Sequence, residues 1–186
     1  WHDHAHHLRT LAHPVLERLV DKTGECAHIA LLVGDRALII EDLEAKSRGL
    51  QVRAGVGRTM PLHCTALGKA FLAFTPTPIP DVLHPRTERT ITRRAALNQH
   101  LDEIRLQGYA FDDVENEEGV RCLAAPVRDA SGATIAALGI SAPLVRLDDD
   151  SVEPLATSVK RAAAACSRLL GHEPAQVGET ARSTLR

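Results

Sequence analysis

The residues best able to bind a ligand lie in two apolar runs, 122–127 and 134–141, that a short polar segment separates. Residues 129–132, with the sequence Asp-Ala-Ser-Gly, have turn composition, which favours a β-hairpin. Cysteine begins the first run and serine ends the second, so a thiol and a hydroxyl stand at the open end of this hairpin. Both groups form hydrogen bonds, and a thiol can also act as a nucleophile.

The hairpin register places these groups on one face of the sheet. A symmetric turn centred between residues 130 and 131 pairs Cys122 with Gly139, and Val120 with Ser141 where the strand reaches that far. Because side chains alternate between the two faces of a strand, all four residues share a face. Gly139 has no side chain, so we expect a gap there in which a ligand approaches the backbone. The alternative for Cys122 is core packing, the usual environment of a free cysteine.

A helix start provides a second feature that suits an anion. Thr65 is a good N-cap for a helix over residues 66–74, which three prolines between residues 76 and 80 keep from continuing. The amides near Ala66, Leu67 and Gly68 have no partner within such a helix, and the helix dipole is positive at this end. We therefore expect a carboxylate to bind there.

A thiol enzyme is the competing interpretation of the same residues. Cys122 or Cys64 would be the nucleophile, with His63 as its base. No acidic residue that could orient the histidine is evident nearby, and neighbours in sequence need not meet in space. The four cysteines match no C-x-x-C spacing, which favours reduced thiols over a zinc or redox site. We accordingly expect no catalytic residues.

Two further segments carry residue types that bind metals. His2, His4, His6 and His7 lie near a chain end, where solvated histidines are the more common outcome. Residues 113–119 form an acidic stretch that lacks the ligand spacing of a calcium loop. Because most charge runs of this kind are solvated, we expect neither a metal nor a cofactor.

The elements that position these groups follow from the apolar periodicity. We expect helices over residues 8–20, 66–74, 92–107 and 151–170, and strands over residues 26–33, 37–40, 50–53, 109–112, 122–127 and 134–141. Gly24, Gly108 and Gly171 are placed to end three of the helices. Strands and helices do not alternate regularly, so this order predicts an α+β fold with a mostly antiparallel sheet of about six strands.

Composition and charge exclude several classes of protein. The 186 residues are 44% hydrophobic and 25% charged, which are ordinary values for one globular domain rather than a disordered chain. The net charge of −2, with both signs mixed along the chain, gives no footprint for nucleic acid. No apolar run reaches the roughly 18 residues of a membrane span, and no signal peptide opens the chain, so we expect a cytoplasmic protein.

Several separated segments resemble, in the same order, the IclR family of transcription regulators. They are LERL at 16–19 before TGE at 23–25, PLHCTALGKA at 61–70, GYAFDD at 108–113, EEGVRCLAAPV at 117–127 and ALGISAP at 137–143. The resemblance is specific because these segments are spread over most of the chain.

This resemblance implies a GAF-like effector-binding domain, with a curved antiparallel sheet flanked by helices. It divides the chain into an N-terminal linker helix region over residues 1–20, an effector-binding domain over residues 21–171 and a flexible tail over residues 172–186. A winged helix-turn-helix would precede the linker in the full protein and bind operator DNA. The resemblance also implies a homodimer or homotetramer.

In members of this family that bind small keto acids, the ligand occupies positions that can be carried over to this chain. The effector-binding positions are Leu50, Ala66, Leu67, Val120, Cys122, Gly139 and Ser141, to which the helix start adds Gly68. The same pattern places Asp112 at the rim of the pocket, where we expect it either to contact a ligand or to order the acidic loop. This chain departs from the family at Gly139, often serine, and at Asn116, often histidine. Loss of a hydroxyl at Gly139 would remove one hydrogen bond, about 1 kcal/mol, and enlarge the pocket for a larger or partly aromatic acid.

Three functions remain open on the sequence. The first is a regulator in which a bound acid biases the arrangement of subunits and hence operator binding, with no turnover of the acid. The second is the thiol enzyme, whose turnover Cys122→Ser or Cys64→Ser would abolish. The third is a ligand-free dimerisation module with the first and last helices at its interface.

Overall fold

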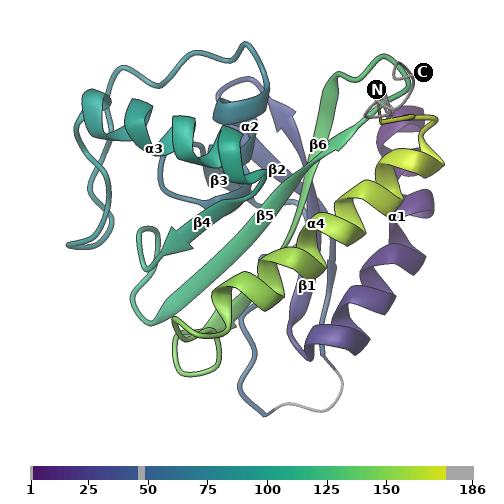
Figure 1. Ribbon diagram of the computed structural model, residues 1–186, viewed down its shortest axis with the longest axis horizontal. Helices are drawn as coiled ribbons and strands as arrows, with labels where there is room; N and C mark the ends of the chain where they lie inside the picture. The colour runs from purple at the N-terminus through teal and green to yellow at the C-terminus, as the bar shows by residue number, and fades with distance from the viewer. Residues whose placement is uncertain (1, 46–48, 175–186) are drawn as a thin grey trace, which may run out of the picture.

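The strands form one sheet. The computed structural model of the chain describes residues 2–45 and 49–174. Its six strands are all antiparallel to their neighbours, in the order β3-β2-β1-β6-β5-β4 (Figure 1). They are β1 (Cys26–Val33), β2 (Arg36–Leu43), β3 (Thr59–Pro61), β4 (Ala110–Asp113), β5 (Val120–Arg128) and β6 (Thr134–Pro143). The antiparallel α+β fold predicted from the sequence is therefore confirmed.

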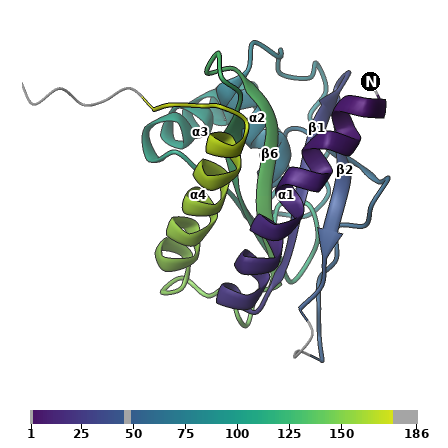
Figure 2. The same cartoon turned by 90° about the vertical axis from the view of Figure 1, so that its right-hand side faces the viewer.

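Helices cover both faces of the sheet. Helices α1 (His2–Thr23) and α4 (Val152–Leu169) lie side by side on one face, as Figure 2 shows. Helices α2 (Ala66–Phe74) and α3 (Arg94–Gln107) pack on the other face. Each helix pair forms an apolar core with the sheet. Because side chains alternate between the two faces of a strand, β5 contributes to both cores: Leu123 belongs to the first and Ala124 to the second.

Local signals fixed the helix ends that matter for the site. The Thr65 hydroxyl accepts a hydrogen bond from the Gly68 amide at 3.0 Å, so Thr65 is the N-cap of α2, as predicted. Gly108 ends α3 in the left-handed conformation with φ of 82°. Helix α3 begins at Arg94, two residues later than the expected start.

The expected strand over residues 50–53 is absent, and β3 forms nine residues later at Thr59–Pro61. Gly55 and Gly57 both have φ of 85°, which turns the chain back towards β2. The Ile39 amide then donates to the Arg58 carbonyl at 3.0 Å. The alternation at 50–53 was therefore a misleading signal, because the two glycines delay strand pairing.

The hairpin of β5 and β6 has a different register from the predicted one. Cys122 lies opposite Ser141, and Gly139 lies opposite Ala124. The turn is longer than a symmetric pairing requires, because the Asp129 amide donates to the Ala133 carbonyl and a bulge interrupts the ladder next to Arg128. The shift amounts to two residues along β6, so the predicted face of the sheet is unchanged.

Helix α1 runs through residue 20, where we placed the end of the linker region. Its apolar side chains, including Leu8 and Leu16, belong to the same core cluster as β1 and α4. The described residues thus show no structural break at that position, and the division into linker, domain and tail stays a prediction. Residues 175–186 of the expected tail lie outside the described part. Among the described helices, none has the length and apolar character needed to cross a membrane.

Candidate functional site

A small cavity lies between the start of α2, the open end of the β5–β6 hairpin and the segment before β3. Its volume is about 40 Å³. The cavity is lined by His28, Val52, Arg53, Ala54, Arg58, Met60, Thr65, Ala66, Leu67, Asp112, Asn116, Glu117, Val120, Cys122 and Ser141. Six of the nine predicted effector-binding residues are among them, so the structure brings most of that set together.

The thiol and hydroxyl predicted to share a face are in contact. The Cys122 Sγ and Ser141 Oγ atoms lie 3.1 Å apart, and either atom can be the donor. Burial raises the pKa of the Cys122 thiol, and the nearby Asp112 carboxyl raises it further. The cavity wall therefore presents a neutral thiol bonded to a hydroxyl, and the hydrogen that this pair does not use internally can be donated to a ligand.

Helix α2 presents two backbone amides at the same place. Within α2 the Gly68 amide donates to the Thr65 hydroxyl and the Lys69 amide to the Thr65 carbonyl. The amides of Ala66 and Leu67 precede these and have no partner among the described residues. With the positive end of the helix dipole, they form an anion-binding feature beside the Cys122 and Ser141 pair.

Two titratable groups of the wall are held close to their neutral forms. Burial raises the pKa of Asp112 to about 7, against the opposing effect of Lys69. Burial likewise lowers the pKa of His28 to about 4, against the effect of Asp42. Near neutral pH the wall therefore carries an uncharged imidazole and a partly protonated carboxyl, which repels an anionic ligand less than a carboxylate would.

Two arginines that sequence reasoning missed also line the cavity. Arg53 is paired with Asp42 and Glu44, each at 3.5 Å. Arg58 donates to the Ala54 carbonyl at 3.2 Å and has no carboxylate partner among the described residues. Arg58 thus gives the cavity a cation that is free to pair with an acid.

Three of the predicted positions do not line the cavity. Leu50 is 64% exposed and lies outside it. The Gly68 amide is used by the N-cap, and a Cβ atom at Gly68 would lie 2.4 Å from the Pro61 carbonyl oxygen. Gly68 therefore serves the close packing of α2 against the preceding loop.

The gap expected at Gly139 is also wrong. A Cβ atom at Gly139 would lie 2.1 Å from the carbonyl oxygen of Leu123 and 3.0 Å from the Cβ atom of Ala124. The space next to Gly139 is thus filled by β5 itself, and the expected enlargement of the pocket does not occur. This glycine permits close approach of two strands rather than of a ligand.

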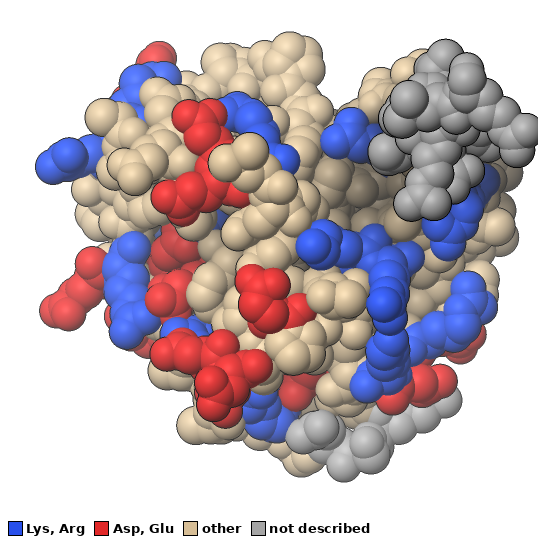
Figure 3. All heavy atoms as spheres, in the orientation of Figure 1, with Lys and Arg blue, Asp and Glu red and all other residues tan. Residues whose placement is uncertain are grey.

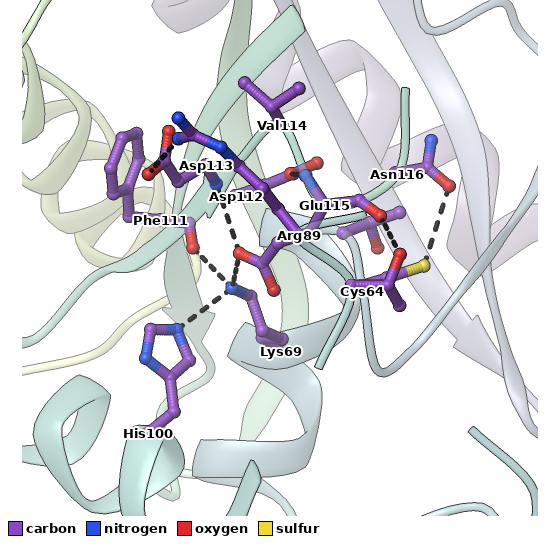
Figure 4. Close-up of polar contacts among 12 residues, drawn as sticks. Cys64, Lys69, Arg89, His100, Phe111, Asp112, Asp113, Val114, Glu115 and Asn116 are labelled. Carbon is purple, nitrogen blue, oxygen red and sulfur yellow. Dashed lines mark hydrogen bonds and ion pairs between the residues drawn. The ribbon is translucent and has the colours of Figure 1, made fainter. Parts of the chain in front are cut away.

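A buried ionic cluster beneath the cavity was not predicted. Lys69 is fully buried, and its Nζ atom lies 2.5 Å from Glu115 Oε2 and 2.9 Å from His100 Nε2, as Figure 4 shows. Nζ also donates to the carbonyl of Phe111. The Glu115 amide donates to Asp112 Oδ1 at 2.7 Å, so the cluster directly supports a residue of the cavity wall.

A signal for this cluster was present in the sequence. Lys69 is the only charged residue in the nine residues of α2, ALGKAFLAF, and eight of those nine are buried. A buried lysine needs a carboxylate partner, and the acidic stretch over residues 113–119 supplies one. Val114 in that stretch has φ of 60°, a costly conformation for a β-branched residue, which the loop tolerates as it wraps over Lys69.

The geometry does not support a thiol enzyme. His63 Nε2 lies 2.9 Å from the carbonyl oxygen of His84, whereas Cys64 Sγ contacts Asn116 Oδ1 at 3.6 Å. Burial raises the pKa of Cys64 to about 12. The two side chains thus have different partners, and the thiol stays protonated. Among the described residues, no group of three or more His, Cys, Asp or Glu is arranged to hold a metal.

Comparison with known proteins identifies the family. Residues 3–168 match the family model described as the C-terminal domain of the bacterial transcriptional regulator IclR. The chain is 34% identical to the transcriptional regulator XynR of Escherichia coli, over 89% of this chain and 68% of that protein. Across the first curated relatives, the chain spans between 56% and 68% of their length.

Solved structures give the same result. The crystal structure of Thermotoga maritima IclR matches with a TM-score of 0.81 and 32% identity, covering 89% of this chain and 69% of that one. An IclR homologue from Microbacterium hydrocarbonoxydans, solved in complex with 4-hydroxybenzoate, matches with a TM-score of 0.75 and 27% identity, with the same coverage. The relatives are transcriptional regulators, not enzymes. This chain belongs to the IclR family of bacterial transcriptional regulators and corresponds to its C-terminal domain.

Proposed function

We propose that this chain is the effector-sensing domain of a DNA-binding regulator and that a small organic acid binds in the cavity. One observation carries the proposal: the Cys122 and Ser141 pair lines the same cavity as Ala66 and Leu67, whose backbone amides at the start of α2 are unpaired among the described residues. A carboxylate between them accepts hydrogen bonds from both sides. The acid is bound and not transformed, because no activated nucleophile lines the cavity.

The size of the cavity limits what binds without rearrangement. A volume of about 40 Å³ corresponds to about three water molecules. An acid with more than a few heavy atoms therefore requires side chains of the cavity wall to move outward. An aromatic acid, 4-hydroxybenzoate, is bound by the Microbacterium homologue, which supports an acid of that class here.

In the whole protein the acid would modulate binding to operator DNA through an N-terminal DNA-binding domain. The acid would bias the arrangement of subunits in a homodimer or homotetramer, and such a regulator would act in the bacterial cytoplasm. A coupling of typical size, about 1–3 kcal/mol, corresponds to a change in operator affinity of about 5- to 150-fold.

The test is calorimetry and thermal unfolding of this chain with 4-hydroxybenzoate and a series of short keto acids. We expect at least one acid to bind saturably and to raise the unfolding temperature. Ser141→Ala should weaken that binding about tenfold or more, since it removes a hydrogen bond to a charged group. Ser158→Ala is the matched control, because the Ser158 hydroxyl is exposed and bonded within its own helix.

Each part of the proposal has an outcome that contradicts it. Conversion of an acid to product, lost in Cys122→Ser, would favour the thiol enzyme. If none of the acids binds, the domain acts without a ligand of this class, as the dimerisation module would. Unchanged affinity in Ser141→Ala would place the acid outside the cavity.

A further inference from the structure

A second and larger hollow lies between α3, α4 and the end of β5. Its volume is about 340 Å³. Strand β4 pairs only with residues 121–124, so β5 has no strand partner beyond Ala124 on this side. We call this hollow the basic groove, defined by the side chains of Arg105, Arg128, Lys160, Arg168 and His172 that line it.

The uncovered edge of β5 is not available to an added strand. Pro126 has no amide hydrogen, and the Arg128 amide donates to the Ser167 hydroxyl at 2.9 Å. The Ser167 hydroxyl in turn donates to the Ala163 carbonyl. A β-strand therefore cannot pair with this edge of β5, but the groove has room for a ligand of another kind.

Four full positive charges line the groove, and no carboxylate does. Of these four cations, only Arg105 has an ion pair with another described residue, Asp102 at 2.7 Å. Arg128 lies over the ring of Phe74 and donates to the Gly132 carbonyl. Carbonyl and ring contacts therefore position Arg128 and Lys160 without neutralising them.

Helix ends give a simpler reason for basic residues here. Helices α2, α3 and α4 all end at the groove, and each C-terminus carries about half a negative charge. Lys160 donates to the Gln107 carbonyl at 3.2 Å, and Arg105 donates to the Ala73 carbonyl at 2.8 Å. The three helix ends together with Asp102 supply about two and a half negative charges against the four positive charges of the groove. About one and a half positive charges remain, so the helix ends do not account for all four cations.

The remaining surface of the groove is apolar. Ala125, Pro126, Ala163 and Ala164 lie between the cations, and the ring of Phe74 borders them. Figure 3 shows basic side chains bordering a hollow beside α4, while most acidic side chains lie on the other half of that face. A ligand that fits both properties has an apolar or aromatic body and a negative group.

We propose that the basic groove is a second binding site of this domain, for a small organic anion with an apolar or aromatic body. The negative group pairs with Arg168 and Arg128, and the body lies on the alanines of α4 and on Pro126. This site is separate from the cavity at the start of α2, and it does not depend on the function proposed for that cavity.

The probe for this site is 8-anilinonaphthalene-1-sulfonate, an aromatic anion whose fluorescence reports binding. We expect saturable binding of one molecule per chain, weakened about tenfold by Arg168→Glu. Arg161→Glu is the matched control, because Arg161 is an exposed arginine of the same helix that does not line the groove. It should leave the affinity within about twofold.

Two further measurements separate the alternatives. Ala164→Trp fills the groove without changing its charge and should also weaken binding of the probe, whereas Ser141→Ala in the cavity should not. Circular dichroism and the unfolding temperature establish that each variant is folded. Probe binding that Arg168→Glu and Ala164→Trp leave unchanged overturns the proposal. A change of molecular mass in Arg168→Glu, with unchanged probe affinity, would instead make the groove a contact between copies of the chain.

Discussion

At the scale of single residues, Lys69 is a charged side chain that is fully buried. A buried ammonium is tolerated only when carboxylates and carbonyls replace the water it loses, and Glu115, Phe111 and His100 do this here. The pKa of His100 is lowered by burial and by Lys69, so its neutral ring can accept a hydrogen bond from the Lys69 ammonium group. Glu115 therefore connects the ionic cluster to the cavity, because its carboxylate pairs with Lys69 and its backbone amide donates to Asp112.

Lys69→Met should lower the free energy of unfolding by about 3–5 kcal/mol, because it leaves Glu115 buried without a cation. Urea unfolding measures this change. Adding Glu115→Gln should recover part of the loss by removing the charge. Lys22→Met, at an exposed position, is the control and should change stability by less than about 0.5 kcal/mol. A small effect of Lys69→Met would mean that water reaches the ammonium in solution.

The raised pKa of Asp112 predicts a pH dependence. A carboxyl whose pKa rises from 3.8 to about 7 on folding binds more protons in the folded state, so its contribution to stability falls as pH rises between these values. His28, with its pKa lowered to about 4, has the opposite effect below its unfolded value of 6.5. The two effects offset one another in the wild-type curve.

A difference between variants isolates Asp112. The stability of Asp112→Asn relative to the wild type should increase from pH 5 to pH 8, because the asparagine has no proton to lose. Urea unfolding at several pH values gives both curves, with His28 contributing equally to each. A difference that does not change with pH would show that Asp112 is ionised throughout this range.

At the scale of elements, the helix ends at Thr65 and Gly108 were predicted correctly, whereas the register of the β5–β6 hairpin was not. The cap at Thr65 and the glycine end at Gly108 depend on a few neighbouring residues, and both are where the sequence placed them. The β5–β6 register depends on the length of a turn, and one bulge next to Arg128 was enough to move it. The register differs from the predicted one by two residues, and side chains on the same face of a strand are also two residues apart. Cys122 and Ser141 therefore still share a face of the sheet, as predicted.

Gly139 shows where a change of one residue would disturb an element. Gly139→Ala should destabilise the domain by about 1–3 kcal/mol, since the added carbon meets the backbone of β5. Gly49→Ala is the control, because nothing lies within 4 Å of a Cβ atom there. Chemical denaturation compares the two variants. Equal effects of the two changes would mean that the strands separate at little cost.

At the scale of the whole molecule, α1 is connected to the site through β2. In β2, Asp42 lies opposite His28 of the cavity wall, and the preceding residue, Glu41, points to the other face of the sheet. Glu41 Oε2 accepts hydrogen bonds from Arg9 at 2.8 Å and from His13 at 3.2 Å, and both residues belong to α1. Movement of β2 at the cavity would therefore reach α1 directly.

Whether α1 belongs to the folding unit decides how such a movement is transmitted. Its large buried side chains are Leu8, Val15, Leu16, Leu19 and Val20. Their burial contributes about 8–15 kcal/mol, which matches the whole stability of a typical domain, about 5–15 kcal/mol. A chain that starts at residue 21 should therefore lose cooperative unfolding, and calorimetry measures this. Leu16→Ala should cost about 2–5 kcal/mol, whereas Arg18→Ala on the exposed side should cost little. If the shortened chain folds cooperatively, α1 is a separable linker and does not transmit movements of β2 as part of the folded domain.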